Sequence, residues 1–221
     1  MWFKNSLNFK DLKVNHLVKY FIFSDLFLVA GMGLVAPIFA IFIVDRIEGA
    51  TLITVGIAAA VYWLVKSLVQ LPLAIYLDKT EGERDEFYTL VGGLMLISFV
   101  AVLFVFISNI WHLFLLQAVQ AIAFAMYTPS WSGIFSRHLD RDKPAFEWTL
   151  NSTVLGFSHG VTAAVGGILA SQFGFNVVFL GAAALSFVAA VVIFFSPDIV
   201  FPKPSSSIPI IRDHRLQNFG H

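Results

Sequence analysis

The chain of 221 residues is 58% hydrophobic and 13% charged, and its mean hydropathy is +0.81. Soluble globular domains carry roughly 25% charged residues, so this composition excludes an ordinary cytoplasmic enzyme, a nucleic-acid-binding module and a disordered regulator. Basic and acidic residues balance at fourteen each, which gives no sign of a polyanionic partner. Because the chain has no cysteine, it offers no disulfide, thiolate metal site or catalytic thiol.

Six apolar stretches are long enough to cross a membrane, which takes about 20 residues in a helix. They run over 20–44, 51–77, 89–108, 110–136, 147–172 and 176–195. Of all the charged residues, Asp25, Lys66 and Glu147 alone fall within them. The pattern predicts an all-α integral membrane protein with six transmembrane helices, located in the plasma or inner membrane.

The orientation is predicted by the basic residues of the connections, since Lys and Arg concentrate on the cytoplasmic side. Twelve of them fall on the side of the two termini, and Arg46 alone falls on the other. Both termini are therefore expected in the cytoplasm. Residues 1–19 form a lead-in to the transmembrane domain over 20–195, and the proline- and serine-rich segment 196–221 reads as a flexible tail.

Polar residues inside a membrane are costly and often functional, so their distribution among the spans is informative. Beside the charged residues, those of interest are Tyr62, Gln70, Gln117, Gln120, Tyr127, Asn151 and His159. From Leu90 to Ser108 in the third span and from Val177 to Phe195 in the sixth, no residue is more polar than serine. We therefore expect four helices to share a polar interior and the third and sixth to face lipid.

Asp25 and Lys66 are opposite charges within the spans, and two interpretations are open. Asp25 could couple transport to protons, with Lys66 as its partner or as a contact for an anionic substrate. The two could equally form a structural ion pair, or Lys66 could extend toward water. His159 could relay protons because its pKa lies near neutrality, or it could simply bond between helices.

The amides and tyrosines of the spans (Tyr62, Gln70, Gln117, Gln120, Tyr127, Asn151) could line a substrate pathway, although such residues also bond helices together without a ligand. Glu147 begins a helix, where the helix dipole favours a carboxylate, and we interpret it as structural. The acidic run 81–86 reads as a solvated loop.

Small residues and prolines indicate where helices can approach one another or bend. Gly156, Gly160 and Ala164 recur every four residues, and this spacing lets two helix backbones pack closely in lipid. Pro37 and Pro129 are expected to bend the first and fourth helices. Among chemical alternatives, no phosphate-binding loop is present and the histidines lack metal-ligand spacing. We therefore expect no cofactor, no metal and no enzyme activity.

The connection between the second and third spans reads AIYLDKTEGER. It resembles the signature of the major facilitator superfamily of secondary transporters, in which glycine, aspartate and basic residues follow one another in this order. Asp78, Lys79, Gly82 and Arg84 match the signature in type, while Ala74 replaces its first glycine. The resemblance implies that this loop latches the two halves of a transporter on the cytoplasmic side.

Two further segments resemble the same family. The fourth span reads QAIAFA from Gln120 and reaches Pro129, with small residues where the family has glycines. The fifth span ends in a Gly-Gly pair and is followed by FGFNVVF, similar to the family's opening of the sixth helix. Ala163 stands where the family's antiporters carry a proline, which favours symport or uniport.

The resemblance covers one six-helix half, of the N-terminal type, whereas family members generally have two such halves. It implies a half-size secondary transporter that moves a small solute by alternating access, as a parallel homodimer or with a separately encoded half. The alternative is a truncated or accessory membrane protein that retains the bundle without transporting.

Overall fold

The computed structural model describes residues 14–79 and 83–196. In this part of the chain the elements are α1 (His16–Val35), α2 (Phe39–Arg46), α3 (Leu52–Lys79), α4 (Arg84–Leu103), the 3-10 turn η2 (Phe104–Phe106), α5 (Ile110–His138), α6 (Pro144–Phe173) and α7 (Phe175–Phe194). The protein is all-α, and six of these helices are long and apolar enough to cross a membrane. The predicted flexible tail and most of the lead-in lie outside the described residues and stay predictions.

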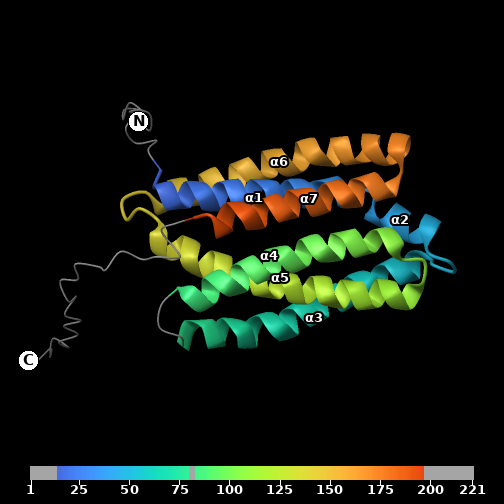
Figure 1. Ribbon diagram of the computed structural model, residues 1–221, viewed down its shortest axis with the longest axis horizontal. Helices are drawn as coiled ribbons and strands as arrows, with labels where there is room; N and C mark the ends of the chain where they lie inside the picture. The colour runs from blue at the N-terminus through green and yellow to red at the C-terminus, as the bar shows by residue number, and fades with distance from the viewer. Residues whose placement is uncertain (1–13, 80–82, 197–221) are drawn as a thin grey trace, which may run out of the picture.

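The helices form two groups of three that lie side by side (Figure 1). In one group α1 packs against α6 and α7; in the other α5 packs against α3 and α4. The contact of α4 with α7 joins the groups, and α3 and α6 lie at the outer edges as the most exposed helices. We call the end at which α1 begins the basic end, because six of the eight described Lys and Arg residues lie there. The opposite end is called the α2 end.

The expectation that the third and sixth spans face lipid is only half right. Their helices, α4 and α7, do expose Phe99 and Phe187 on one side. On the other side they pack against each other in the middle of the bundle and bury Leu94, Ile97 and Ala183. Van der Waals packing also joins helices in lipid, and the hydroxyl of Ser98 on α4 donates to the carbonyl of Ala183 on α7 at 2.8 Å. A helix without strongly polar residues can therefore lie in the middle of the bundle.

The two predicted bends have different outcomes. At Pro37 the chain leaves the helix, so that α1 ends at Val35 and α2 begins at Phe39. Proline has no N–H to donate and its ring clashes with the preceding turn, which explains the break. Pro129 lies inside α5, which continues to His138. Its neighbour Thr128 bonds back to the carbonyl of Phe124 at 2.8 Å, as is common in such helices.

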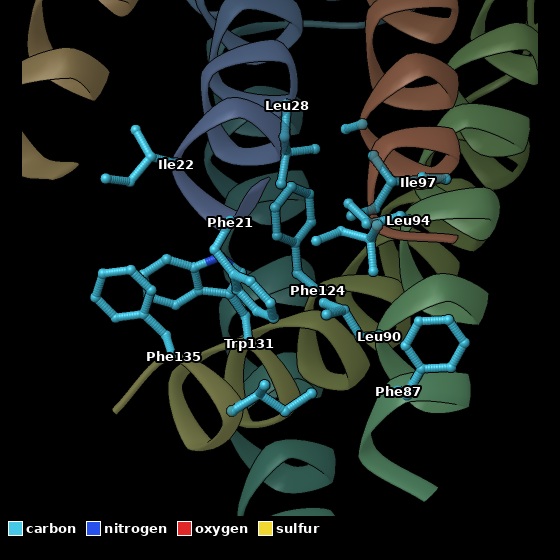
Figure 2. Close-up of a cluster of buried hydrophobic side chains, with 14 of the residues drawn as sticks. Phe21, Ile22, Leu28, Phe87, Leu90, Leu94, Ile97, Phe124, Trp131 and Phe135 are labelled. Carbon is cyan, nitrogen blue, oxygen red and sulfur yellow. The ribbon is translucent and has the colours of Figure 1, made fainter. Parts of the chain in front are cut away.

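Two aromatic clusters hold the ends of the bundle. Toward the basic end, Phe21 of α1 packs on Trp131 and Phe135 of α5, whose rings stack at 4.5 Å between centroids (Figure 2). Toward the α2 end, Phe42 and Phe179 lie 4.6 Å apart between centroids, with Phe104 beside them. Each cluster joins helices of both groups, so neither group can move without repacking aromatic rings.

Glycine brings α1 and α6 into close contact, but not at the predicted stripe. A methyl group on Gly166 would lie 2.1 Å from the carbonyl oxygen of Leu34, and one on Gly33 would meet Thr162. Gly156 and Gly160 instead lie on the exposed face of α6, where an added methyl group would meet nothing within 4 Å. The stripe is therefore not used to pack this bundle.

Candidate functional site

Asp25 lies at the meeting point of three helices. Its side chain is buried on α1, and the hydroxyl of Tyr127 on α5 donates a hydrogen bond to its Oδ1 atom. The amide Nδ2 of Asn151 on α6 donates to its Oδ2 atom at 3.3 Å. Both donors are neutral, and no described Lys, Arg or His pairs with Asp25. Removing a carboxylate from water is costly unless it is paired, so this group is unusual for a structural residue.

The sequence places these residues on facing surfaces. Phe21, Asp25 and Leu28 follow one another at helical spacing on the buried face of α1. Asn151 and Ser158 share the buried face of α6, and the hydroxyl of Ser158 donates to the carbonyl of Leu26 at 3.3 Å. The polar contacts thus fix α6 against α1 around the carboxylate.

Lys66 is not the partner of Asp25. Its ammonium lies over the rings of Trp63 and Phe124, 5.3 and 5.8 Å from their centroids. The two residues are kept apart because Lys66 is on α3, which packs on α5, whereas Asp25 is on α1. The structure therefore shows no Asp25–Lys66 ion pair, and cation–π contacts hold the lysine instead.

His159 also stays away from Asp25. It lies on the exposed face of α6, two turns beyond Asn151. The hydroxyl of Thr162 donates to the backbone carbonyl of His159 at 3.4 Å, which does not involve the imidazole. A change in the rotamer of His159 alone would not bring its imidazole to Asp25. A proton relay between them would therefore require the helices to move.

A cavity of about 260 Å³ lies on the α2 side of Asp25. Its polar lining comes from Tyr62, Gln117, Gln120 and Ser186, and its apolar lining includes Met32 and Phe179. Since the lining residues Ala36, Ala59 and Trp63 are themselves exposed, the cavity opens on the surface between α1 and α3.

The predicted pathway residues thus fall into separate places. Tyr62, Gln117 and Gln120 line the cavity, and the Oε1 atom of Gln120 is buried without a partner among the described residues. Tyr127 and Asn151 bind Asp25 instead. Gln70 is half-buried on α3 and does not line the cavity. The rings of Tyr62, Phe124 and Tyr127 follow one another at 6.1 Å between centroids and connect the cavity wall to the donor of Asp25.

The predicted gating loop lies at the basic end. Asp78 and Lys79 end α3 and are exposed, and Arg84 begins α4 and is exposed as well. Gly82 lies outside the described residues, so the geometry of the loop itself is not described.

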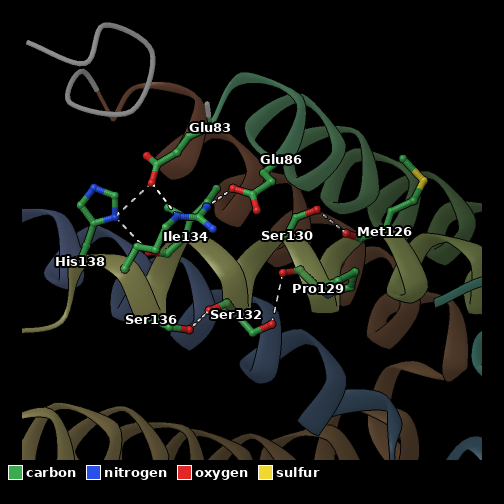
Figure 3. A network of polar contacts seen from close by, with 10 residues as sticks. Glu83, Glu86, Met126, Pro129, Ser130, Ser132, Ile134, Ser136 and His138 are labelled. Carbon is green, nitrogen blue, oxygen red and sulfur yellow. Dashed lines mark hydrogen bonds and ion pairs between the residues drawn. The ribbon is translucent and has the colours of Figure 1, made fainter. Parts of the chain in front are cut away.

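An ionic cluster beside that loop was not expected. Arg137 of α5 pairs with Glu83 at 3.0 Å and with Glu86, and the Nδ1 atom of His138 lies 3.6 Å from Glu83 (Figure 3). Glu86 is 3% exposed, so the interpretation of the acidic run as a solvated loop is wrong at this position. The spacing of Glu83 and Glu86, three residues apart on one helix face, was the available signal.

Glu147 lies in the first turn of α6, as expected, and its side chain also binds the connection that precedes this helix. Its side chain is 0% exposed, and its Oε2 atom accepts a hydrogen bond from the backbone N–H of Asp140 at 2.9 Å. This bond fixes the α5–α6 connection against the helix that follows it.

Comparison with known proteins identifies the family of this bundle. The family model described as the Major Facilitator Superfamily matches residues 21–214. The chain belongs to the Major Facilitator Superfamily. An uncharacterized MFS-type transporter of Methanocaldococcus jannaschii is 23% identical to it over 190 residues, which are 86% of this chain and 48% of that protein. The chain thus spans about half the length of that curated relative. Members of the superfamily are transporters rather than enzymes, and the six apolar helices agree with a membrane protein of this kind.

Proposed function

We propose that the chain forms one half of a secondary active transporter that moves a small solute across the membrane by alternating access. The observation that carries the proposal is the buried carboxylate of Asp25, held by Tyr127 and Asn151 beside a cavity that opens on the bundle surface. Ionisable residues inside a membrane are rare and often mark substrate or ion pathways, which makes Asp25 a functional-site candidate. We propose no catalytic activity for the chain.

The second half is a second copy of this chain in parallel orientation, or a separately encoded six-helix bundle. Two facts support this: the relative is about twice as long, and α3 and α6 are the most exposed of the six spans. Around the mouth of the cavity, Trp63 and Met32 are exposed. A second bundle that covers them would enclose the cavity between two halves, as in transporters with two repeats.

Asp25 is proposed as the proton-coupling group. A carboxylate tolerates its charge in water but not in a dry site with neutral donors. A motion that separates α1 from α5 and α6 would wet Asp25, and closure would dry it again. Proton binding and helix closure are thereby linked, which is the requirement for using a proton gradient.

The bundle is proposed to lie with its basic end in the cytoplasm. The support is the distribution of described Lys and Arg residues, six at the basic end and Arg46 at the α2 end. A topology reporter fused after Ser108 should report the outside of the cell. A cytoplasmic signal at that position would reverse the orientation.

The test uses the full chain reconstituted on a solid-supported membrane. Sugars, amino acids, carboxylates, nucleosides and hydrophobic cations are applied in turn at several pH values, and the transient current is recorded. We expect at least one class to give a pH-dependent current that Asp25→Asn removes and the exposed matched control Asp45→Asn keeps. No current from any class, or an equal current in Asp25→Asn, would favour the accessory, non-transporting alternative.

A further inference from the structure

On α5 and α6, from the level of Asp25 toward the basic end, three buried polar atoms have no hydrogen-bond partner among the described residues. They are Oδ1 of Asn151, Nε1 of Trp131 and Oε1 of Glu147. The three residues are 4%, 7% and 0% exposed. A buried polar atom without a partner is costly because it has lost its hydrogen bonds to water, so three of them at one interface require an explanation.

The three residues lie along one direction that starts at Asp25. Glu147 precedes Asn151 by four residues on α6, and Trp131 follows Tyr127 by four on α5. Four residues are one turn, or about 6 Å along the axis, and share a helix face. Asn151 and Tyr127 bind Asp25 directly, so Glu147 and Trp131 lie one turn closer to the basic end.

Ring contacts confirm that α1, α5 and α6 meet at this level. The centroid of Trp131 lies 6.2 Å from that of Phe21 on α1 and 5.9 Å from that of Trp148 on α6. Trp148 is the neighbour of Glu147 in the first turn of α6. The unsatisfied atoms therefore belong to one three-helix interface rather than to separate parts of the molecule.

The chemistry of the three atoms is that of a binding place for water. Trp131 offers a donor, while Asn151 and Glu147 offer acceptors. Buried water molecules typically make about three hydrogen bonds to such groups. Water bound at these atoms would give each of them a hydrogen-bond partner. Among these groups Glu147 is distinct, because its carboxyl can itself carry a proton.

We propose that Glu147 is a proton-carrying residue, and that a water-connected route between α1, α5 and α6 links it to Asp25. The carboxyl of Glu147 takes a proton from solvent and passes it to a bound water. That water releases a proton to Asp25, so each transfer breaks one O–H bond and forms another. The inference rests on the proposed proton coupling by Asp25, and it gives the proton a path separate from the cavity.

Charged and polar groups of α5, of the α5–α6 connection and of the residue just before α1 lie at the outer end of this route, near Glu147. Asp140, whose N–H bonds Glu147, forms an ion pair with Lys143 at 3.5 Å in the α5–α6 connection. His138 of α5 bonds the carbonyl of Ile134 through Nδ1 at 2.9 Å. Just before α1, the Nδ2 atom of its N-cap residue Asn15 donates to the carbonyl of His138 at 3.2 Å. Asp140 and Lys143 are partly exposed, so solvent can deliver a proton beside Glu147.

The first test follows the protonation of Asp25 by time-resolved infrared spectroscopy after a pH jump, with the full chain in lipid nanodiscs. Asp25→Asn identifies the carboxyl band. We expect Glu147→Gln to keep the final amplitude of this band but to slow its appearance by about 10²-fold, the low end of the contribution of a positioned proton-transfer group. Gln retains the acceptor for the N–H of Asp140, so the connection should stay folded.

Two controls separate this proposal from the one on which it rests. Glu83→Gln removes another carboxylate of the basic end, one that binds Arg137, and the Asp25 band should appear at the wild-type rate in this variant. Glu147→Asp keeps a carboxyl group, so its band should appear much faster than in Glu147→Gln. If no Asp25 band titrates, the proton-coupling proposal itself fails. If the band titrates at the same rate in Glu147→Gln as in the wild type, only the route fails.

The second test needs no variant. Radiolysis of water oxidises side chains that contact a bound water, so the native chain is irradiated in isotopically labelled water and the label is located by mass spectrometry. Trp131 should be labelled much faster than Phe21 and Phe179, although all three are buried. Labelling of Trp131 as slow as that of these two would overturn the route.

Discussion

At the scale of single residues, the molecule's polar interior depends on Asp25 and its two neutral donors. The hydroxyl of Tyr127 is the donor that can be removed with the least change of shape. Tyr127→Phe leaves Oδ1 of Asp25 without its donor inside the bundle. We expect the free energy of unfolding to fall by about 1–3 kcal/mol, measured by thermal denaturation in detergent.

Tyr62→Phe is the matched control for that experiment. Tyr62 also packs on Phe124, but its hydroxyl bonds none of the described residues. The control should therefore unfold like the wild type. Equal stability of both variants would mean that the bond between Tyr127 and Asp25 contributes nothing to the fold.

Arg137 allows a second prediction at this scale. Arg137→Gln leaves Glu86 buried without its cation, and we expect a loss of about 1–3 kcal/mol of unfolding free energy. Adding Glu86→Gln should recover part of that loss, because the uncompensated charge disappears. Exposed Arg141→Gln should cost little. If the double variant loses as much unfolding free energy as the single variants Arg137→Gln and Glu86→Gln lose together, or more, the two residues are not coupled and the pairing is contradicted.

At the scale of helices, the contact between α1 and α6 depends on one glycine. A methyl group on Gly166 would overlap the backbone of Leu34, and backbone cannot yield as a side chain does. Gly166→Ala should lower the unfolding free energy by about 1–3 kcal/mol, as overpacking does. The measurement is thermal denaturation of the purified chain in detergent.

Gly156→Ala provides the control on the same helix. Its methyl group would meet nothing, and alanine favours a helix over glycine by about 0.5–1 kcal/mol. This variant should unfold at the same or a higher temperature than the wild type. If both glycine variants behave alike, the close approach of α1 and α6 is not what holds them.

The sequence predicted the helices well and their neighbours poorly. Apolar length alone predicts six spans, because a membrane requires that length of any helix. The sequence also indicated Asp25 and Lys66 as candidate functional residues, because charged residues are rare within transmembrane helices. It could not predict that α5 separates these two residues, because that depends on which helices pack together. Glu86 was misjudged for the same reason: its partner Arg137 comes from a distant helix and not from its own segment.

At the scale of the whole molecule, the proposed parallel dimer makes a prediction about the basic end. In that arrangement Asp78 at the end of α3 is expected near the start of α6 in the other copy. The native chain has no cysteine, so Asp78→Cys and Phe146→Cys in separate copies should form a disulfide-linked dimer in membranes. The bond requires Cα atoms within about 7 Å.

The control pair should use a residue from the other end of the bundle. Asp45→Cys, exposed on α2, should not link to Phe146→Cys of another copy, because the two sites lie at opposite ends of parallel bundles. A chain that stays monomeric by native mass spectrometry and gives no cross-link under oxidant would refute the homodimer and favour a separately encoded half.

The positions of the first and the last membrane-length helix have a consequence for the genetics of such a protein. With six crossings, α7 ends at the basic end where α1 begins (Figure 1). Two copies translated in tandem would therefore stay parallel with only a cytoplasmic linker between them, if the basic end lies inside. An odd number of crossings would invert the second copy and require an additional helix to correct it. Gene duplication can thus convert such a bundle into a twelve-helix chain in one step, after which the two halves are free to diverge.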